Sequence, residues 1–565
     1  MEYIAIDIET KKNGAEPDPY LDPLLILSFV ASDGREGVFL RNEVPQWILE
    51  VLEDPSVLKL IHHASFEAMF LKHNFGKALK NVWDTLAVER ALTAGTSVSC
   101  DLASVADRRL GIRLDKSVRA EFGNGLISDR GKEYCLQDSR VLPEIYKQQK
   151  EIAKKNGQLY VAELESLMAV VAGYMQLSGI DFDVDLWHKY VPMMEEKRAA
   201  AERLVWDYLG VAYSEDIFGG VSGGVPLSCT DRVLNALRQK GIDLSDYQSS
   251  TLETYLYSDV PEEKKRIVSG LLEFKRWDKA VGWDYPKFIH PVTGRIHAKF
   301  NPQGADTLRF SCSDPNLQQV TRPFGGVNFR NLFIAGPGHR FVGADYSQIE
   351  LRILANESEE PSLLRAFLEG EDLHALAAEA ILGRPIRDKS ERNLGKVYNF
   401  GVRAYGGGPD ALIGSALEYG IVMSQKDAKT YIARMKKADK QVEAWANRMY
   451  EKMTNDGYIQ TPMGHRRYIS GGKARPTVAR NTPIQMFAAG IAKEAIKNLV
   501  ENIDKAKVAA DLVLVVHDEI VLRCQESEAE KLRCILEESM VQAGNSWLKK
   551  VPCLVDSYIS ERWEK

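Results

Sequence analysis

Two apolar runs that lie far apart in the sequence each lead to an aspartate, and no other feature limits the fold as strongly. Asp345 follows apolar residues in FVGADYSQIELRILA, and Asp518 lies between apolar residues in DLVLVVHDEIVLRC. The first pattern predicts a buried strand that ends near Asp345, and the second predicts a tight hairpin with Asp518 in its turn. Strand-like stretches near 300–350 and 511–560 bracket a helical pattern. We therefore expect one sheet built from two separated parts of the chain.

The two aspartates have the chemistry of a divalent-metal site, and Glu519 directly follows the second of them. Carboxylates are hard oxygen ligands that suit Mg²⁺, which keeps water and substrate phosphates as its other ligands. Two protein carboxylates can therefore suffice for two ions in phosphoryl transfer. An isolated DxE or HDE is more often a capped turn or a solvated charge, so it is the combination that favours a metal site.

A basic stripe between the two aspartates supports the same chemistry. Arg392, Lys396 and Phe400 stand four residues apart in ERNLGKVYNFG, so on an α-helix they share one face. The two cations would neutralise a triphosphate as charge moves onto the leaving group. A solvated basic face is the alternative explanation. The aromatic ring and the glycines that follow it argue against that alternative, because such a ring can pack against a sugar or a base.

Composition narrows the class of protein. The 45% hydrophobic and 27% charged content over 565 residues is typical of a globular protein with three or four domain-sized units. No apolar run approaches the roughly 18 residues of a membrane span, and MEYIAIDIET does not fit a secretion signal. Seven scattered cysteines without a CxxC pair favour reduced thiols, so we expect a cytoplasmic protein without a membrane anchor. The net charge of −6 gives no global indication of nucleic acid.

Changes of pattern divide the chain into regions. Alternating strand-like and helix-like runs predict an α/β domain over 1–150. The lysine-rich stretch at 146–158 is the predicted domain boundary, although it could equally continue as a solvated helix. The remaining regions are a mostly helical lobe at 159–290 that GGVSGGVP interrupts at 219–226, a strand-rich part at 291–355, a helical part at 356–500 and a second strand-rich part at 501–565.

Three segments resemble motifs A, B and C of the family A DNA polymerases, namely DYSQIELR, RNLGKVYNFG and VHDE. The resemblance covers about 160–565 and implies a right-hand α+β fold of palm, fingers and thumb. The helical lobe would supply the polymerase entry region and thumb, 356–500 the fingers, and the two strand-rich parts the palm. Asp345, Asp518 and the backbone carbonyl of Tyr346 would hold two Mg²⁺ ions, for which Mn²⁺ can substitute.

The same resemblance implies roles for residues around these motifs. Glu350 resembles the side chain that leaves no room for a ribose 2′-hydroxyl, although a carboxylate in the first turn of a helix is also favoured by the helix dipole. The implied substrate-binding residues are Arg392, Lys396, Phe400, Tyr405, Glu350, Gln348 and His517. The implied DNA-binding residues, from segments similar to TGRxSSxxPNLQ, NxPxQ, GYxxTxxGRRR and LLEYRxxxK, are Arg309, Gln318, Asn481, Gln485, Lys275, Lys279 and Arg466.

Motif B and the segment around Arg309 depart from the family pattern. The family usually has FGxxYG, whereas this chain reads FGVRAYGG, so Tyr405 comes one residue late and Ala404 stands at its expected position. This leaves open which aromatic ring stacks on the template base. Leu308 replaces the glycine of TGR, which costs backbone freedom at a tight position.

The N-terminal region carries a second set of acidic residues. Asp7 and Glu9 alternate along a strand pattern and face the same side, while Tyr134 and Asp138 stand one helical turn apart in EYCLQDSRVL. With Glu67 they resemble a DEDD-type 3′–5′ exonuclease of ribonuclease H-like α/β fold, whose tyrosine orients the attacking water. The resemblance implies two further Mg²⁺ ions, held by the four carboxylates.

The second exonuclease motif matches less closely. It reads HHASFE, so His63 replaces an asparagine and Glu67 replaces an aspartate, and Asp84 in WDTLAVERAL is a further carboxylate in this region. Because a misplacement of about 1 Å can cost two orders of magnitude in rate, the alternative is a domain that survives as a clamp with weak nuclease activity.

The sequence thus predicts a DNA-directed DNA polymerase with 3′–5′ proofreading, in a short form typical of a phage or bacterium and without a preceding 5′ nuclease domain. Its predicted partners are primer-template DNA and deoxynucleoside triphosphates, with a processivity factor or helicase as further candidates and no membrane. One alternative function is a DEDD exonuclease with a C-terminal nucleic-acid-binding platform. A non-catalytic replication-complex scaffold is the other.

Overall fold

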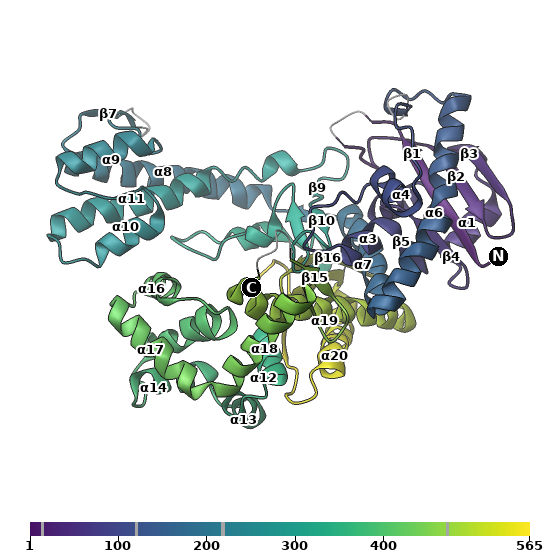
Figure 1. Cartoon of the computed structure of the whole chain (residues 1–565). Helices are drawn as coiled ribbons and strands as arrows, with labels where there is room; N and C mark the ends of the chain where they lie inside the picture. The colour runs from purple at the N-terminus through teal and green to yellow at the C-terminus, as the bar shows by residue number, and fades with distance from the viewer. Residues whose placement is uncertain (13–15, 119–121, 216–220, 470–473, 565) are drawn as a thin grey trace.

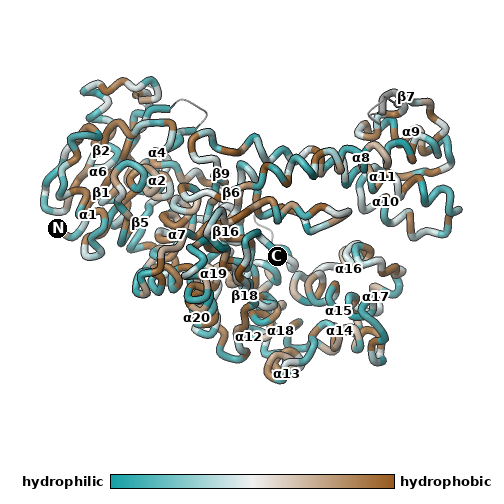
Figure 2. Tube along the Cα trace, turned by 180° about the vertical axis from the view of Figure 1, so that it is seen from behind, coloured by the Kyte–Doolittle hydropathy of each residue, from teal (hydrophilic) through white to brown (hydrophobic). Residues whose placement is uncertain are grey.

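The computed structural model describes residues 1–12, 16–118, 122–215, 221–469 and 474–564. An α/β domain at the N-terminus, a long helical arm and a helical lobe surround a central region that contains the main C-terminal sheet (Figure 1). Hydrophobic segments gather in this central region, where helix and sheet meet, while the outer turns are mostly hydrophilic (Figure 2).

The N-terminal domain is built on a five-stranded sheet with the order β3-β2-β1-β4-β5. Its central strand, β1, buries Ile6 and Ile8 on one face, so Asp7 and Glu9 lie half-buried on the other. The strands are β1 (Tyr3–Thr10), β2 (Leu24–Ala31), β3 (Glu36–Leu40), β4 (Leu58–Ile61) and β5 (Val82–Asp84). The helices are α1 (Gln46–Glu53), α2 (Ala64–Phe75), α3 (Thr85–Leu92), α4 (Leu102–Leu110) and α6 (Asp129–Asn156).

The lysine-rich stretch belongs to a helix. It forms the last turns of α6, which ends where Gly157 adopts a left-handed conformation with φ of +67°. The following helix, α7 (Leu159–Ser178), packs against α2, α3 and β5 of the first domain and also against β10, β16 and α19 of the rest of the chain. The two halves of the molecule are therefore joined by a shared, buried helix.

The helical arm projects from the central region (Figure 1). Two long helices, α8 (Val184–Leu209) and α11 (Glu262–Val281), pack along each other and share a core with the short helices at the tip. The smaller elements are β7 (Tyr213–Glu215), β8 (Val221–Gly223), α9 (Thr230–Gln239) and α10 (Ser249–Leu256). The glycine-rich segment predicted to interrupt the helices lies partly outside the described residues, and its described part includes β8.

The central sheet confirms the prediction that two separated stretches form one sheet. Its order is β16-β17-β13-β18, with β13 (His339–Tyr346) between strands from the C-terminal part of the chain. Those strands are β16 (Ala510–Val516), β17 (Glu519–Gln525) and β18 (Val555–Ser560). The helices α12 (Ile349–Ser358), α19 (Pro476–Ala506) and α20 (Ala529–Trp547) contribute to the same core. Short strands flank the sheet: β6 (Ile180–Phe182), β9 (Arg295–Ile296), β10 (Lys299–Asn301), β11 (Ser311–Ser313), β12 (Phe333–Ile334), β14 (Tyr458–Gln460) and β15 (Arg466–Tyr468).

The helical lobe contains one departure from the predicted helix. The motif B stripe was expected on a single α-helix, but α15 (Lys389–Val397) ends before Phe400 and continues as a π-helical turn, η5 (Tyr398–Ala404). The prediction is therefore wrong for the last residue of the stripe. The other helices of the lobe are α13 (Pro361–Glu369), α14 (Leu373–Leu382), α16 (Pro409–Leu417), α17 (Gln425–Ala438) and α18 (Lys440–Asp456).

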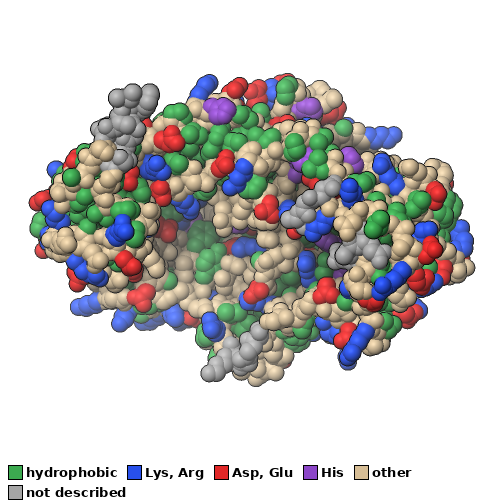
Figure 3. Space-filling view, turned by 90° about the horizontal axis from the view of Figure 1, so that it is seen from above, with side chains coloured by type: hydrophobic (Ala, Val, Ile, Leu, Met, Phe, Trp, Pro, Cys, Tyr) green, Lys and Arg blue, Asp and Glu red, His purple; other side chains and the backbone are tan. Residues whose placement is uncertain are grey.

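Acidic and basic side chains are interspersed over the face seen from above, which shows no single large basic patch (Figure 3). None of the helices in the described ranges combines the length and the apolar character that crossing a membrane requires.

Candidate active sites

The central sheet brings the two predicted metal-binding aspartates together. Antiparallel pairing of β13 with β17 sets Asp345 opposite Glu519, and Asp518 lies in the turn that precedes Glu519. The backbone N–H of Tyr346 donates to the carbonyl of Asp518 at 3.3 Å, which ties the end of β13 to this turn. The turn itself requires His517 to adopt a left-handed conformation with φ of +55°. Both aspartates therefore lie on rigid backbone.

The electrostatics of this site favour a bound cation. Burial raises the pKa of Asp518 to about 7, the Arg309 guanidinium lowers it, and Glu350 and Asp345 raise it further. Two further carboxylates and one guanidinium therefore lie within interacting range of Asp518. Because like charges in a buried site repel, divalent cations suit this donor set. Asp345 and Asp518 are thus the residues that could hold metal ions here.

Glu519 is held differently from its neighbour. Its carboxylate accepts hydrogen bonds from the Tyr558 hydroxyl at 2.7 Å and from the Trp563 indole at 3.4 Å, and burial raises its pKa. The predicted catalytic role of Glu519 stays a prediction. In the structure its carboxylate packs against these aromatic side chains at the end of the sheet.

Glu350 is the centre of a second group of predicted residues. It is buried in the first turn of α12, where it is paired with the Arg309 guanidinium and accepts a hydrogen bond from the Tyr405 hydroxyl. Burial raises the pKa of Tyr405, and the Glu350 carboxylate raises it further. Tyr405 therefore reaches the site although it comes one residue later than the family pattern. Leu308, next to Arg309, adopts a left-handed backbone with φ of +57° where the family has glycine.

Two of the other predicted residues have buried polar atoms that are still available. The side-chain oxygens of Gln348 and Asn481 are buried without a hydrogen-bond partner. Gln318 donates to the Val515 carbonyl at 3.0 Å, so its amide is anchored to β16. Gln485 contacts Tyr405, and burial lowers the pKa of His517. These placements are compatible with the predicted contacts to the primer end, which stay predictions.

The basic residues predicted to bind triphosphate and DNA have protein partners in the structure. Arg392 Nε lies 2.5 Å from Asp372 Oδ2, and Lys396 Nζ lies 5.5 Å from the centre of the Tyr419 ring. Phe400 packs against the His374 ring at 5.8 Å between ring centres. The remaining contacts are Lys275 with the Tyr247 carbonyl at 2.7 Å, Lys279 with the Trp283 ring at 5.8 Å, and Arg466 with Asn156 and Gln460 at 3.1 and 2.9 Å.

Arg466 differs from the others because it is buried. Its guanidinium lies 3.8 Å from the centre of the Tyr458 ring and binds the carbonyl at the end of α6. This placement suits a structural contact between the two halves of the molecule. Its predicted role in DNA binding stays a prediction.

The N-terminal domain gathers its acidic residues at one end of the sheet. Burial raises the pKa of Asp7 well above its ordinary value, and the Glu9 and Asp138 carboxylates raise it further. Burial likewise raises the pKa of Glu67, with Asp7 as the next cause. Glu67 Oε2 and Asp138 Oδ1 are buried without a hydrogen-bond partner. A group of four carboxylates, in which Glu67 and Asp138 each keep one open oxygen atom, is a donor set that fits divalent cations.

The described residues contain no cluster of three or more His, Cys, Asp or Glu side chains already arranged as a complete metal site. A cation of the protein itself lies among the carboxylates. Lys116 Nζ donates to Asp138 Oδ2 at 2.8 Å and to the Tyr134 hydroxyl at 3.2 Å. Sequence reasoning missed Lys116, because a single lysine in an irregular segment carries no periodic signal.

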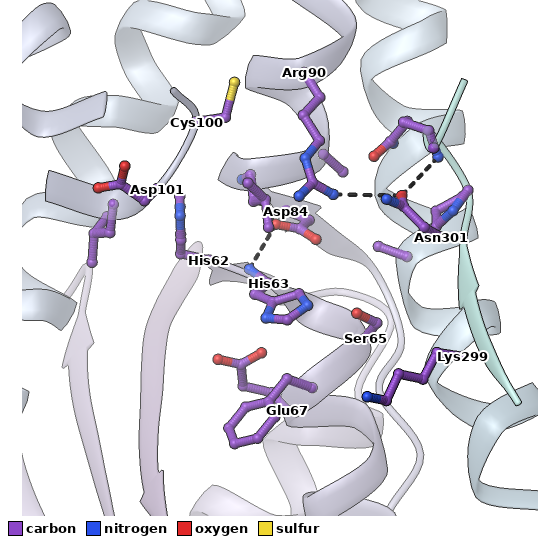
Figure 4. Close-up of a pocket in the computed structure, with 18 of the residues that line it drawn as sticks. His62, His63, Ser65, Glu67, Asp84, Arg90, Cys100, Asp101, Lys299 and Asn301 are labelled. Atoms are coloured by element: carbon purple, nitrogen blue, oxygen red, sulfur yellow. Dashed lines mark hydrogen bonds between the residues drawn. The ribbon is translucent and has the colours of Figure 1, made fainter. Parts of the chain in front are cut away.

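Asp84 has a structural role in this domain. Its carboxylate accepts hydrogen bonds from the backbone N–H groups of His63 at 3.0 Å and Ala64 at 2.9 Å, and it also caps α3 at Leu86 (Figure 4). This capping bends the chain at His63, where φ is +87°, and begins α2 so that Glu67 faces the cavity. The divergent second motif therefore still presents its glutamate to the other acidic residues.

The acidic end of this domain opens into a cavity of about 1530 Å³. One wall carries Asp7, Glu9 and Glu67, and another comes from the hairpin of β10 and β11 in the second half of the chain. Figure 4 shows Lys299 and Asn301 from that hairpin at the same cavity as Glu67. The nuclease-like site therefore faces the central region of the molecule.

Two family models match this chain. The model for DNA polymerase family A matches residues 233–565, which is more than half of the chain, and the model for a 3′-5′ exonuclease matches residues 1–153. Both matches agree with the resemblances drawn from the sequence motifs.

Curated relatives include bacterial DNA polymerases I. The protein of Aquifex aeolicus is 29% identical over 528 residues, which cover 89% of this chain and 87% of that protein. The protein of Pseudomonas aeruginosa is 27% identical over 93% of this chain and 58% of its own length. The thermostable protein of Thermus aquaticus is 30% identical over 71% of this chain and 48% of its own length. The chain thus spans about half the length of the latter two relatives.

A solved structure has the same fold. It is described as the POL domain of Pol1 from M. smegmatis in complex with DNA primer-template and dNTP, and it superposes with a TM-score of 0.82. The match covers 99% of this chain and 95% of that one at 22% sequence identity. The expected combination of an exonuclease-like α/β domain with a polymerase fold is confirmed.

Proposed function

This chain belongs to DNA polymerase family A and carries a 3′-5′ exonuclease domain at its N-terminus, and we propose that it extends a DNA primer at Asp345 and Asp518. The observation that carries this proposal is the meeting of these two aspartates at the end of one sheet, beside Arg309 and Glu350. The proposed substrates are primer-template DNA and deoxynucleoside triphosphates.

The proposed chemistry is phosphoryl transfer with divalent metal ions, which membership of this family implies. The carboxylates of Asp345 and Asp518 would hold two Mg²⁺ ions, or Mn²⁺ in their place, together with the backbone carbonyl of Tyr346. When bound, such ions activate the primer 3′-hydroxyl and neutralise the leaving pyrophosphate. The chain's own contribution is position, because Asp345 lies near the end of paired strand β13 and Asp518 lies in the tight turn that a backbone hydrogen bond ties to that strand.

Primer extension with Asp518→Asn tests the proposal. This substitution keeps the size of the side chain and removes its charge, so we expect extension to fall at least about 100-fold, as for other losses of a precisely placed group. Glu526→Gln is a matched control, because Glu526 lies just past the far end of β17 and pairs at the surface with Arg340. Undiminished extension by the Asp518→Asn protein would contradict the assignment of the polymerase reaction to this site. A wild-type protein that degrades the primer but does not extend it would favour the exonuclease-with-platform alternative, and one with neither activity would favour the scaffold.

We further propose that Glu350 excludes ribonucleotides. Its carboxylate is buried and held by Arg309 and Tyr405, so it presents a fixed obstacle beside the metal-binding aspartates. Glu350→Ala should reduce the preference for deoxynucleotides over ribonucleotides by about tenfold or more, since a small pocket change is worth roughly 1–3 kcal/mol. Single-turnover incorporation of both nucleotides measures this preference. Glu369→Ala, an exposed glutamate at the end of α13, is the control.

The N-terminal site is proposed to remove mismatched nucleotides from the primer 3′ end. Asp7, Glu9, Glu67 and Asp138 would hold two divalent ions, which would activate water for hydrolysis. Tyr134 would orient that water, because it lies one helical turn from Asp138 and faces the same cavity. The open oxygens of Glu67 and Asp138 are the observation that supports an active nuclease rather than a clamp.

A further inference from the structure

The π-helical turn η5 compensates for the extra residue in motif B. In an α-helix each residue turns the chain by about 100°, so one added residue before Tyr405 would rotate its side chain away from Glu350. A π-helical turn, with its i→i+5 hydrogen bonds, takes up one additional residue within the same length of helix. Residues Tyr398–Ala404 have this conformation, and the Tyr405 hydroxyl does reach Glu350.

A buried ion pair fixes the π-helical turn from one side. Arg403 is 5% exposed and Asp439, between α17 and α18, is 2% exposed. Arg403 Nε lies 2.8 Å from Asp439 Oδ2, and its second terminal nitrogen lies 2.9 Å from Oδ1. The remaining terminal nitrogen donates to Asn399 Oδ1 at 2.6 Å, one turn earlier. The guanidinium thus joins both ends of the turn to a neighbouring helix pair.

Two further contacts tie the turn to its surroundings. The backbone carbonyl of Arg403 accepts a hydrogen bond from Arg480 Nε at 2.8 Å, and Arg480 is paired with Glu443 at 2.7 Å. The amide of Asn399 donates to the Leu373 carbonyl at 3.1 Å. The turn is therefore anchored to α14, α18 and α19 at once.

Such a network is a poor way to gain stability. Removing two charges from water costs several kcal/mol per ion, and well-packed apolar residues often serve equally well or better. What a planar guanidinium with a two-pronged contact provides is a single allowed geometry. π-Helical turns are rare in proteins, and those that occur are often found at functional sites. The network is therefore better explained by the position that it enforces than by the energy that it supplies.

We propose that Arg403 is a positioning residue for nucleotide selection, which holds the π-helical turn through Asp439 so that Tyr405 can fix the Glu350 carboxylate. This inference rests on the proposed function of Glu350. Glu350 is held by Arg309 on one oxygen and by Tyr405 on the other. Loss of the Tyr405 contact leaves the carboxylate held by Arg309 alone, so that it can turn about this contact and admit a ribose 2′-hydroxyl.

The test is a double-mutant cycle with Arg403→Lys and Tyr405→Phe. Lysine keeps the positive charge but lacks the fork that contacts Asp439 and Asn399 together. We expect Tyr405→Phe to reduce deoxynucleotide preference about tenfold, the size of one hydrogen bond to a charged group, and Arg403→Lys to reduce it about fivefold. The double variant should match Tyr405→Phe alone, because both act through one contact.

Arg384→Lys is the matched control. Arg384 makes a similar two-pronged contact with Glu391, at 2.7 and 2.8 Å, in the same lobe but at the surface. The Arg384→Lys protein should keep the wild-type preference for deoxynucleotides over ribonucleotides. Asp439→Asn weakens the same contact from its other side, because it keeps the shape of the acceptor but not its charge. Like Arg403→Lys, it should reduce the preference for deoxynucleotides.

Two results would overturn the inference. One is an unchanged nucleotide preference in both Arg403→Lys and Asp439→Asn. If the thermal unfolding midpoint fell while the preference stayed the same, Arg403 would have a purely structural role. The other is full additivity of Arg403→Lys and Tyr405→Phe. Failure of the wild-type protein to incorporate any deoxynucleotide would instead contradict the proposed function, so the two failures are distinguishable.

Discussion

The two acidic sites of this molecule balance their negative charge in different ways. At the central sheet, the Arg309 guanidinium lowers the pKa of Asp518 and also pairs with Glu350. In the N-terminal domain, Glu9 and Asp138 raise the pKa of Asp7 beyond the effect of burial, and Lys116 only partly offsets them. The first site holds its acidic residues with an arginine that is always charged, whereas the second concentrates carboxylates around a lysine. We infer that the second site depends more strongly on divalent cations.

The largest expected effect is the loss of one activity, primer degradation, while the other, primer extension, is retained. Asp7→Asn should abolish degradation of a mismatched primer end, by at least about 100-fold, because it removes a centrally placed ligand. Extension of a matched primer should stay within twofold of wild type. Both are measured on one labelled primer-template. Loss of both activities together would contradict the separation of the sites, and persistent degradation would mean that the N-terminal site is misassigned.

A smaller effect concerns the divergent second motif of the nuclease. Glu67→Asp restores the residue type of the family but draws the carboxylate back by about one methylene, so we expect degradation to fall roughly 30-fold. Glu67→Gln, which keeps the length and loses the charge, should be at least as impaired. A rise in degradation with aspartate would indicate that Glu67 is misplaced in the native chain and that the domain acts mainly as a clamp.

The pH dependence of stability should differ between the metal-free wild type and Asp518→Asn. Burial raises the pKa of Asp518 from 3.8 to about 7. Its contribution to stability is therefore fully present below about pH 4 and is lost as the pH rises through about 7. Between pH 5 and 8 the Asp518→Asn protein should gain about 2 kcal/mol relative to wild type, at about 1.4 kcal/mol per pKa unit.

This pH effect is measured by thermal or denaturant unfolding with EDTA present. Saturating Mg²⁺ should reduce it, because a bound cation stabilises the ionised carboxylate. A constant difference between the two proteins across this pH range would show that Asp518 is ionised throughout in the folded state.

The smallest effect concerns Lys116. Its ammonium group binds the Asp138 carboxylate and would compete with a metal ion for it. Lys116→Met should therefore tighten Mn²⁺ binding about threefold to fivefold, because it removes this charge repulsion. Mn²⁺ titration followed by electron paramagnetic resonance measures this, in an Asp345→Asn, Asp518→Asn background that leaves the N-terminal site alone. Lys132→Met is the control, because Lys132 lies on α6, as Asp138 does, but pairs at the surface with Asp129. Weaker binding would instead mark Lys116 as a support for the ligands.

Local patterns made much of the fold and of both sites predictable. Asp7 and Glu9 share a face because strand side chains alternate, and the strand–turn pattern around Asp518 predicted a hairpin. The motif resemblance then identified the family. The position of Lys116 and the structural use of Asp84 were not predictable, because each depends on a segment distant in sequence.

Motif B shows where the limit lies. The sequence by itself determined the order of acidic and basic segments and the pairing of two distant strand regions, because these follow from periodicity and residue type. It also indicated the family, through the resemblance of its motifs. Only the tertiary structure decided that Tyr405 reaches Glu350 and that Arg466 is buried. The reason is physical: a one-residue shift in helical register has no signature in the hydrophobic pattern, and it is set by the Arg403–Asp439 contact between separate helices.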